Sequence, residues 1–533
     1  MAWLLIAASA PAGIPDNSVE ANGVGRIHFP ITASPAAQAQ FDRAVAMLHS
    51  FWYEELGREF GKVIELDPNC AMAYWGLAMG LWHPLWDPPD TNELKEGFAA
   101  VDKATQIGTK TLREQAYIAA ISSFYKDYQT VDHDTRAQRY LRAMEKIHDL
   151  YPEDHEATAF YALALLGTAS LSDRSYTNQV RAAALLEKVA AAQTNHPGVV
   201  HYRIHAYDTP TLAARGLPEA WCYAQIAPAI PHAQHMPSHI FTRLGLWKDS
   251  IRANLASEAA AKSYAAQTKM VGTWDEQLHA MDYLAYAYLQ TAQDKAAARL
   301  VGEVRNMRRA AQGNFKSGYA LAAIPARYVL ERRQWTEAAA LELAPKDFPW
   351  ANHAWPLALN RFARCLGAAR AGKLDEAREQ LALLSQLRSP ETTGPAGYGL
   401  RQVDILYAEA RGYTAYAGRE EAEALRWLKQ AVTEENAIEK RPVTPGPLIP
   451  ARELYAELLL DLKRFDEALA EFDLLLKEAP KRFNALYGAG QAALGLGEKA
   501  RALEYFETLA MNCQHADADR PELLTARKIL QQR

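Results

Sequence analysis

Apolar side chains recur along most of this chain at spacings of three and four residues. In RFDEALAEFDLLLKEAP (464–480), Ala468 and Phe472 belong to such a series, and charged residues occupy positions between them. This spacing places the apolar side chains on one face of an α-helix. β-branched residues show no strand-like alternation, whereas Ala, Leu, Glu, Lys and Arg dominate these segments. The pattern predicts an all-α protein.

The helical segments repeat with a period of 34 residues. Three pairs of matching residues have this separation: Ala468 and Ala502, Phe472 and Phe506, and Ala456 and Gly490. Near the start of the chain, Phe60 and Pro68 have the same offset as Phe472 and Pro480. The pattern resembles the tetratricopeptide (TPR) repeat, in which two antiparallel helices meet at small residues and Pro ends the second. The resemblance implies a TPR-type α-solenoid of antiparallel helix pairs.

The length of the chain and the places where the repeat pattern changes predict several segments. At 533 residues it is too long for one ordinary core. We divide it into residues 1–24 (a tail with features of an export-signal remnant), 25–310 (an N-terminal TPR-like array with a His-rich groove), 311–448 (irregular helical repeats) and 449–533 (C-terminal TPR pairs). Residues 311–356 fit the repeat poorly and predict a distorted helix pair.

The N-terminus has two interpretations. Residues 2–8 are apolar and Ala8-Ser9-Ala10 resembles a signal cleavage site, but no Lys or Arg precedes them. The segment is therefore either the remnant of an export signal, which predicts an exported or periplasmic protein, or an apolar tail on a cytoplasmic one. No other run approaches the roughly 20 apolar residues of a membrane span, so we expect none.

Composition narrows the function classes. With 49% apolar and 23% charged residues the chain is globular, and a net charge of −5 predicts no nucleic-acid partner. The four cysteines form no CxxC pair, which argues against zinc-ribbon and thioredoxin-type sites. No phosphate-binding Gly-rich loop, nucleophile elbow, HExxH motif or dinucleotide fingerprint is present.

Histidines gather in PHAQHMPSHIFTR (231–243). The TPR resemblance implies that the first helix of each pair lines a concave groove, and a repeat starting at residue 231 points His232, His235 and His239 inward. The next repeat, starting at residue 278, places three residues at the same positions: His279, Asp282 and Tyr286. Repeats starting at 37 and 71 likewise place His49 and His83 at one inward position.

A second histidine segment, NHPGVVHYRIHAYDTP (195–210), precedes this one. Thr194 or Asn195 can cap a helix here, since Pro197 suits its first turn, and His196 is expected to be a capping or loop residue. His201 and His205 are four residues apart, a separation at which Cβ atoms lie about 5–6 Å apart and two imidazoles can bind one ion. Asp208 continues the same face.

These segments predict an imidazole-rich site for a transition metal ion, Cu, Zn or Fe. The candidate ligands are His201, His205, His235 and His239, with His232 and His279 as alternates. Three ligands with an open position would resemble catalytic zinc, whereas six histidines (196, 201 and 205 with 232, 235 and 239) could hold a coupled copper pair. The candidate catalytic residues are Asp208, Asp282 and Tyr286. Release of the metal is expected near the free imidazole pKa of ~6.5.

Further residues are candidates for ligand contact in the groove: His49, Trp75, Trp82, His83, Arg203 and Arg243. If Trp75 and Trp82 face inward they form an apolar wall for a ligand; otherwise they pack between repeats. Arg203 and Arg243 can bind a substrate carboxylate or form ion pairs with the scaffold.

Several strings resemble a family of long bacterial TPR-containing proteins, above all HPGVVHYRIHAYD (196–208) and HMPSHIFTRLG (235–245). The resemblance implies no particular reaction. Two functions remain open: a metal-dependent oxidoreductase or hydrolase acting on a small or extended ligand in the groove, and a non-catalytic TPR scaffold that binds a peptide segment of a partner. The sequence does not indicate an oligomeric state.

Overall fold

The structure, a computed structural model, describes residues 23–85, 88–389 and 397–532. Within these ranges no strand forms, and an isolated β-bridge pairs Thr273 with Ala310. The elements follow in this order: α1 (Pro35–His49), α2 (Tyr53–Leu66), α3 (Ala71–Gly80), α4 (Thr91–Ile107), α5 (Leu112–Tyr125), α6 (His133–Leu150), α7 (His155–Gly167), α8 (Thr177–Ala192), α9 (Pro197–Tyr207), the 3₁₀ helix η1 (Ala213–Gly216), α10 (Leu217–Ile226), α11 (Pro231–His235), α12 (Pro237–Arg243), α13 (Trp247–Gln267), α14 (Asp275–Gln290), α15 (Asp294–Arg305), α16 (Phe315–Glu331), α17 (Trp335–Ala339), η2 (Trp350–Asn352), α18 (Ala354–Arg370), α19 (Leu374–Ser385), α20 (Gly397–Ala417), α21 (Glu421–Asn436), α22 (Ala451–Asp461), α23 (Phe465–Glu478), α24 (Phe483–Gly495), α25 (Lys499–Asn512) and α26 (Pro521–Gln531).

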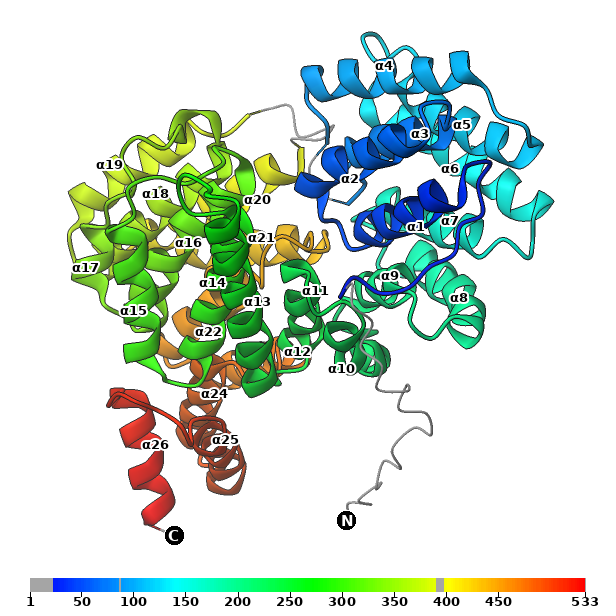
Figure 1. Cartoon of the computed structure of the whole chain (residues 1–533). Coiled ribbons are helices and arrows are strands. Elements are labelled where there is room, and N and C mark those ends of the chain that lie inside the picture. The colour runs from blue at the N-terminus through cyan, green and yellow to red at the C-terminus, as the bar shows by residue number, and fades with distance from the viewer. Residues whose placement is uncertain (1–22, 86–87, 390–396, 533) are drawn as a thin grey trace.

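Consecutive helices pack in pairs, such as α1 with α2, α7 with α8 and α24 with α25. Figure 1 shows these pairs stacked from the blue and cyan helices at the right, through α14–α20 at the left, to α24–α26 below. The all-α, TPR-like solenoid predicted from the sequence is confirmed.

Small residues allow the helices of a pair to approach closely. A Cβ atom on Gly76 of α3 would lie 2.1 Å from a ring carbon of Phe60 on α2, and one on Gly490 would lie 2.4 Å from Phe506. Both aromatic rings are fully buried. The small residues of the 34-residue pattern therefore lie where the predicted contact between helices requires them.

Two helices that carry histidines begin differently from the sequence-based expectation. The N-cap of α9 is His196, whose Nδ1 accepts a hydrogen bond from the backbone N–H of Val199. The expectation that His196 is a capping or loop residue is confirmed, and the alternative of Thr194 or Asn195 as cap is wrong. Pro197 occupies the first turn, as expected. Pro237 separates α11 from α12, but Met236 keeps right-handed helical φ and ψ angles, so His235 and His239 still share a face.

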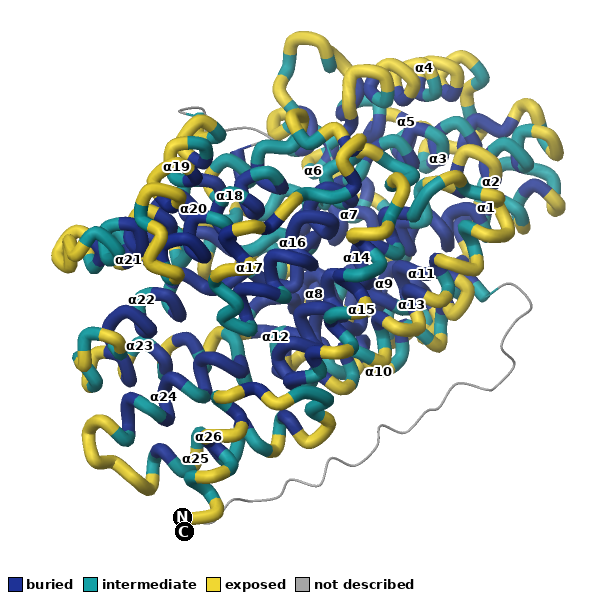
Figure 2. Tube along the Cα trace, turned by 90° about the vertical axis from the view of Figure 1, so that its left-hand side faces the viewer, coloured by how far each residue is buried: buried dark blue, intermediate teal, exposed yellow. Residues whose placement is uncertain are grey.

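The interior of the solenoid is filled. Almost every residue of α14 is buried, whereas outer helices such as α8 bury one face only, and Figure 2 shows this contrast between inner and outer layers. Residues 437–450, which join α21 to α22 and which we call the strap, pass beside the inner helices. Within the strap, Pro442 accepts a hydrogen bond from Tyr283, and Pro447 accepts one from Arg327. The strap therefore occupies the part of the predicted groove beside Tyr283 and Arg327.

The other organisational predictions have different outcomes. The predicted export-signal segment lies almost entirely outside the described residues, and the division into segments stays a prediction. Within residues 311–356, α17 has only five residues and is followed by irregular chain. A search of the described helices finds none with the length and apolar character needed to span a membrane.

Candidate metal centre

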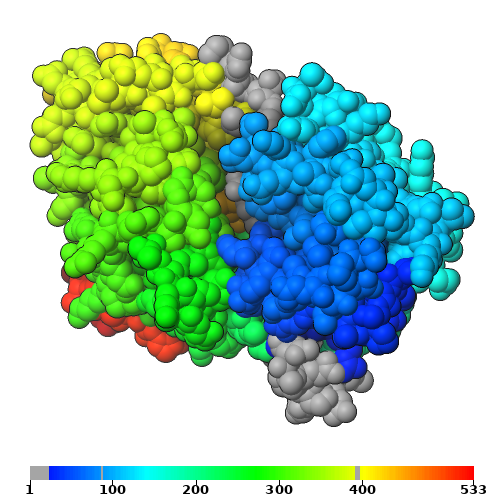
Figure 3. Space-filling view, turned by 45° about the horizontal axis from the view of Figure 1, so that its top comes forward, coloured from blue at the N-terminus to red at the C-terminus, as the bar shows by residue number. Residues whose placement is uncertain are grey.

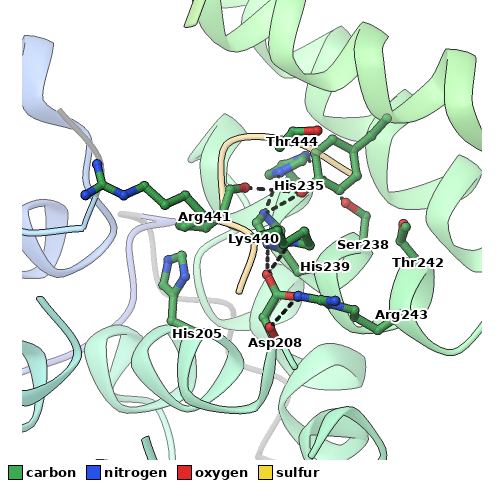
Figure 4. A network of polar contacts seen from close by, with 12 residues as sticks. His205, Asp208, His235, Ser238, His239, Thr242, Arg243, Lys440, Arg441 and Thr444 are labelled. Carbon is green, nitrogen blue, oxygen red and sulfur yellow. Dashed lines mark hydrogen bonds and ion pairs between the residues drawn. The ribbon is translucent and has the colours of Figure 1, made fainter. Parts of the chain in front are cut away.

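Six buried histidines meet where the first helices of three consecutive pairs lie together. They are His201 and His205 on α9, His232 and His235 on α11, His239 on α12 and His279 on α14. None is more than 9% exposed. All six were predicted as metal ligands or alternates, and the structure brings them together. Figure 4 shows His205, His235 and His239 around Asp208 and Lys440.

Three of the histidines, His201, His205 and His232, form the first triad. The Nε2 atom of His201 lies 3.0 Å from Nε2 of His205 and 3.2 Å from Nε2 of His232. The Phe51 ring covers this triad, with its centroid 4.3 Å from that of His201. One nitrogen from each histidine lies within 4.8 Å of the other two, so the triad could hold a metal ion.

The second triad consists of His235, His239 and His279, whose candidate ligand atoms also lie within 4.8 Å of one another. The Nε2 atoms of His235 and His239 are 3.0 Å apart, and the His279 ring centroid lies 4.2 Å from that of His235. The hydroxyl of Tyr283 lies 3.5 Å from Nε2 of His239. This group could likewise hold a metal ion.

The two triads adjoin one another. Ring centroids of His205 and His239 are 5.8 Å apart, and those of His232 and His235 are 6.0 Å apart. The grouping suggested from the sequence, with His196 in one set of three, is wrong. His196 belongs to another cluster, His232 joins the α9 pair, and His279 takes the remaining place.

Hydrogen bonds determine which ring nitrogen carries the proton in three of the six histidines. Nδ1 of His201 donates to the backbone oxygen of His49 at 2.7 Å, and Nδ1 of His239 donates to the Asp208 carboxylate at 2.9 Å. Nδ1 of His235 donates to Oδ1 of Asn254 at 2.6 Å, because the Asn254 amide nitrogen donates to its own helix. A neutral imidazole has one N–H, so each of these rings presents a lone pair at Nε2.

The contact between His235 and His239 therefore joins two acceptors. Neither Nε2 has a proton to donate, so a distance of 3.0 Å is repulsive unless a cation lies between the rings. Two nitrogens bound tetrahedrally at about 2.0–2.1 Å to zinc-like ions lie about 3.3 Å apart. The spacing is thus close to that of a shared metal ion, and oxygen acceptors that hold the other ring N–H of a ligand imidazole are typical of metal sites.

Burial keeps these imidazoles neutral, the form that binds metal. It lowers the pKa of His201 and His235 well below the ordinary value, and neighbouring imidazoles act in the same direction. Burial also lowers the pKa of His239, to about 4, although Asp208 opposes the shift. Asp208 stays charged despite burial, because cationic side chains lie beside it. Burial acts to raise its pKa, but Lys440 and Arg243 outweigh burial and hold the pKa well below its usual value.

A third buried group, His49, Glu156 and His196, is explained by hydrogen bonds alone. Glu156 accepts from Nε2 of His49 at 2.7 Å and from Nε2 of His196 at 3.0 Å. Nδ1 of His49 accepts from the hydroxyl of Tyr202, and Nδ1 of His196 caps α9. Every ring nitrogen has a partner, so this cluster needs no ion. His49, predicted to contact a ligand, is instead part of the support beneath His201.

The predicted catalytic residues have separate locations. Asp208 orients His239 and pairs with Nε of Arg243 at 2.8 Å and Nζ of Lys440 at 2.9 Å. Asp282 accepts from Nε of Arg327 at 3.0 Å, and the Tyr286 hydroxyl accepts from Arg482. Neither Asp282 nor Tyr286 belongs to a triad, because both side chains point to arginines on other helices. Their proposed catalytic role is therefore corrected to structural pairing.

The predicted groove residues mostly belong to the scaffold. Trp75 packs edge-on against Phe29 and Phe160, and Trp82 packs against Phe124 and Tyr140; both are at most 2% exposed. The prediction that they wall a ligand groove is corrected, since aromatic neighbours cover them on several sides.

The arginine and histidine candidates complete this picture. Arg203 pairs with Glu219 at 2.8 Å, and Arg243 bridges Asp208 and Glu439, so both follow the scaffold alternative. His83 lies against the ring of Tyr53, with centroids 4.1 Å apart, and lines the cavity described next.

A cavity of about 130 Å³ reaches the edge of the histidine cluster. Its lining includes His83 and His133 from the N-terminal helices, Lys440 and Arg441 from the strap, and His205 and Asp208 from the centre. Figure 3 shows a furrow on one face, between the blue and cyan helices and the green and yellow ones. The cavity gives a small molecule a polar route to His205.

Sequence reasoning missed Tyr283, Asn254 and Lys440. Tyr283 lies four residues after His279, and that spacing on one helix face could have identified it. Asn254 lies on a second helix of a pair, and Lys440 lies in a loop, so no local pattern connects them with the histidines.

Comparison with known proteins adds little. No protein-family model matches the chain, and no curated protein matches it. Solved structures with similar arrangements include a human IFIT1 dimer with m7Gppp-AAAA (11% identity, 93% of this chain, 99% of that chain, TM-score 0.37) and yeast Tom70 (12% identity, 93% of this chain, 95% of that chain, TM-score 0.33). At these TM-scores the similarity carries no argument about function. The expected lack of a nucleic-acid partner stays a prediction.

Proposed function

We propose that this chain is a metalloprotein that binds two transition-metal ions, one in each histidine triad. The observation that carries the proposal is the 3.0 Å approach of Nε2 of His235 to Nε2 of His239 while both Nδ1 protons are engaged by acceptors. A bound cation converts this repulsion into coordination. At the first triad, two further Nε2 atoms, those of His205 and His232, converge on the Nε2 lone pair of His201, and this convergence is the basis for proposing a second ion.

We propose copper as the metal on grounds of charge. All six candidate ligands are imidazoles. Of the nearby carboxylates, Asp208 pairs with Arg243 and Lys440, whereas Asp275 and Glu276 share Lys316. Two divalent ions would bring twice the charge of two monovalent ions into a buried site whose ligands carry no negative charge, which is costly. Imidazole ligands suit copper, and Cu(I) brings the lower charge.

The function that fits such a pair is oxidation–reduction of a small molecule. Two copper ions held by the triads would pass between the monovalent and divalent states and so exchange two electrons with one bound molecule. A second reactant, an electron acceptor such as dioxygen if that molecule is oxidised, would have to return the ions to their starting state. In this arrangement the six histidines hold the ions, and Asp208, Asn254 and the His49 carbonyl orient three of the rings. The hydroxyl of Tyr283 lies 3.5 Å from Nε2 of His239 and donates to the backbone oxygen of Pro442, so its oxygen is placed to accept a hydrogen bond from a molecule bound at the second triad.

The competing interpretation is a scaffold that binds an extended peptide and performs no chemistry. It has less support, because the strap occupies the interior beside the histidines, where a peptide would lie. Hydrolysis by divalent zinc is the other competing reaction, and the metal content of the purified protein distinguishes the two. An exported location stays a prediction that rests on the N-terminal segment alone.

Elemental analysis tests the proposal. Protein purified without a His tag, from cells supplied with copper and zinc, is expected to contain two copper ions per chain. His201→Gln and His235→Gln are each expected to lose about one, while His28→Gln, a control on an exposed side chain, retains both. Helical circular dichroism verifies that each variant folds. Metal-free wild-type protein, or full occupancy in His235→Gln, would refute the proposal.

A further inference from the structure

A second cavity, of about 360 Å³, is lined by strap residues Arg441, Val443 and Thr444 and shares Arg441 with the cavity that reaches the histidine cluster. We infer that it binds an aromatic carboxylate, with the ring among three aromatic side chains and the carboxylate on Arg441. As a statement about the substrate, this rests on the proposed function. As a statement about binding, it requires no metal.

The walls of this cavity are aromatic. Phe315 stacks on Trp355 with ring centroids 5.3 Å apart, and Tyr398 meets Trp355 edge-on at 5.4 Å. All three line the cavity, together with Arg441 and Thr444. A cavity of this size and lining is in the range of small-molecule sites, and aromatic walls favour a flat ring.

Arg441 supplies the charge. Its guanidinium forms no ion pair with a carboxylate in the described ranges of the chain, although neighbouring Arg174 and Arg243 both pair with Glu439. Instead the guanidinium lies 5.3 Å from the ring centroid of Tyr398, and the backbone N–H of Arg441 donates to the Tyr398 hydroxyl. Asp134 acts on Arg441 electrostatically but forms no ion pair with it. A partly buried arginine that has no ion-pair partner among the described residues is suited to bind a carboxylate through two parallel hydrogen bonds.

Arg441 also connects the two cavities. Arg441 and Pro88 line both the aromatic cavity and the smaller one that contains His205 and Asp208. A molecule whose ring lies among Phe315, Trp355 and Tyr398 therefore has its carboxylate at the junction that leads to the histidines. The end of the molecule that carries the carboxylate is the end nearer the proposed metal ions.

Calorimetry with three probes tests this inference: phenylacetate, its neutral counterpart 2-phenylethanol, and acetate, which lacks the ring. Phenylacetate is expected to bind once per chain, and the other two at least about tenfold more weakly, because each lacks one of the two recognised features. Arg441→Gln should weaken phenylacetate binding about tenfold or more. Phe315→Ala, on a half-buried side chain, should weaken it with fold retained.

Arg378→Gln is the matched control, since Arg378 is exposed on α19 and only contacts Asp375 at 3.6 Å. Its affinity should equal that of the wild type. Titrations of chelator-treated and metal-loaded protein separate the two proposals, because the cavity should bind phenylacetate in both forms even if the histidines hold no metal. Equal affinity for phenylacetate and 2-phenylethanol, unchanged binding in Arg441→Gln, or no binding in either form would overturn the inference.

Discussion

The backbone oxygen of His49 accepts a hydrogen bond from Nδ1 of His201, at a distance of 2.7 Å and across 152 positions of sequence. His49 is the last residue of α1, and its own imidazole is held by Glu156 and Tyr202. The first helix pair therefore sets the ring orientation of a histidine on α9. Three of the following predictions concern this support or its counterparts at the second triad.

Glu156→Gln should destabilise the protein without removing metal. The amide keeps the shape of the carboxylate but cannot accept from both His49 and His196 in the same way, so the unfolding free energy should fall by about 1–3 kcal/mol. Chemical denaturation followed by circular dichroism gives the stability, and elemental analysis gives the metal content. Loss of one metal ion per chain would instead identify this cluster as a metal site.

Asn254→Leu should weaken metal binding at the second triad. His235 then loses the acceptor that holds its Nδ1 proton, and loss of the partner that orients a ligand imidazole typically lowers metal affinity about 10–100-fold. Competition with a chelator of known affinity measures the change. Asn254→Asp, which keeps an oxygen acceptor at 254, is the matched variant and should bind within a few-fold of wild type. Equal loss in both variants would argue against the orienting role.

The metal-free protein should lose stability as the pH falls from about 6.5 to about 4. Burial lowers the pKa of His239 to about 4, so between these values the unfolded chain binds more protons than the folded one. This group alone should cost roughly 3 kcal/mol by the lower end of that range, because one pKa unit corresponds to about 1.4 kcal/mol.

Denaturant titrations of the metal-free protein at several pH values measure this slope, and metal-free His239→Gln should show a shallower one. The lowered pKa values also revise the expectation that metal leaves near pH ~6.5, since protons compete for the buried rings only in more acidic solution. Identical slopes in wild type and His239→Gln would contradict the assignment.

Two glycine substitutions on neighbouring helices should have opposite effects. Gly76→Ala places a Cβ 2.1 Å from the Phe60 ring and should destabilise the N-terminal helices by about 1–3 kcal/mol. Gly61→Ala meets nothing within 4 Å and should stabilise α2 by about 0.5–1 kcal/mol through helix propensity. The midpoints of denaturant-induced loss of helical signal should lie on either side of the wild-type value.

Much of the fold could be predicted because its information is local. The contacts of Gly76 with Phe60 and of Gly490 with Phe506 join neighbouring helices, and the 34-residue period repeats them along the chain. The irregular parts could not be predicted in the same way. For Trp75 and Trp82, helical periodicity cannot distinguish a position that faces the groove from one that packs between repeats. The two kinds of position lie close together on one helix surface.

The sequence predicts which histidines belong to the site, but not how they group into triads. Spacings of four residues identified the pairs His201/His205 and His235/His239, since such residues share a helix face. Assignment of His232 to the first pair and His279 to the second depends on how α9, α11 and α14 cross. Whether the triads bind metal stays a prediction.

The sequence by itself determined the helices, their pairing and the faces that carry histidine, because these follow from side-chain periodicity over a few tens of residues. Tertiary structure alone decided which imidazoles converge, which of their nitrogens carry protons, and how the strap places Lys440 2.9 Å from Asp208 across 232 positions. Those features depend on the curvature of the stacked helix pairs. Each interface between neighbouring pairs adds a small rotation, and the sum of these rotations is not encoded in any single segment.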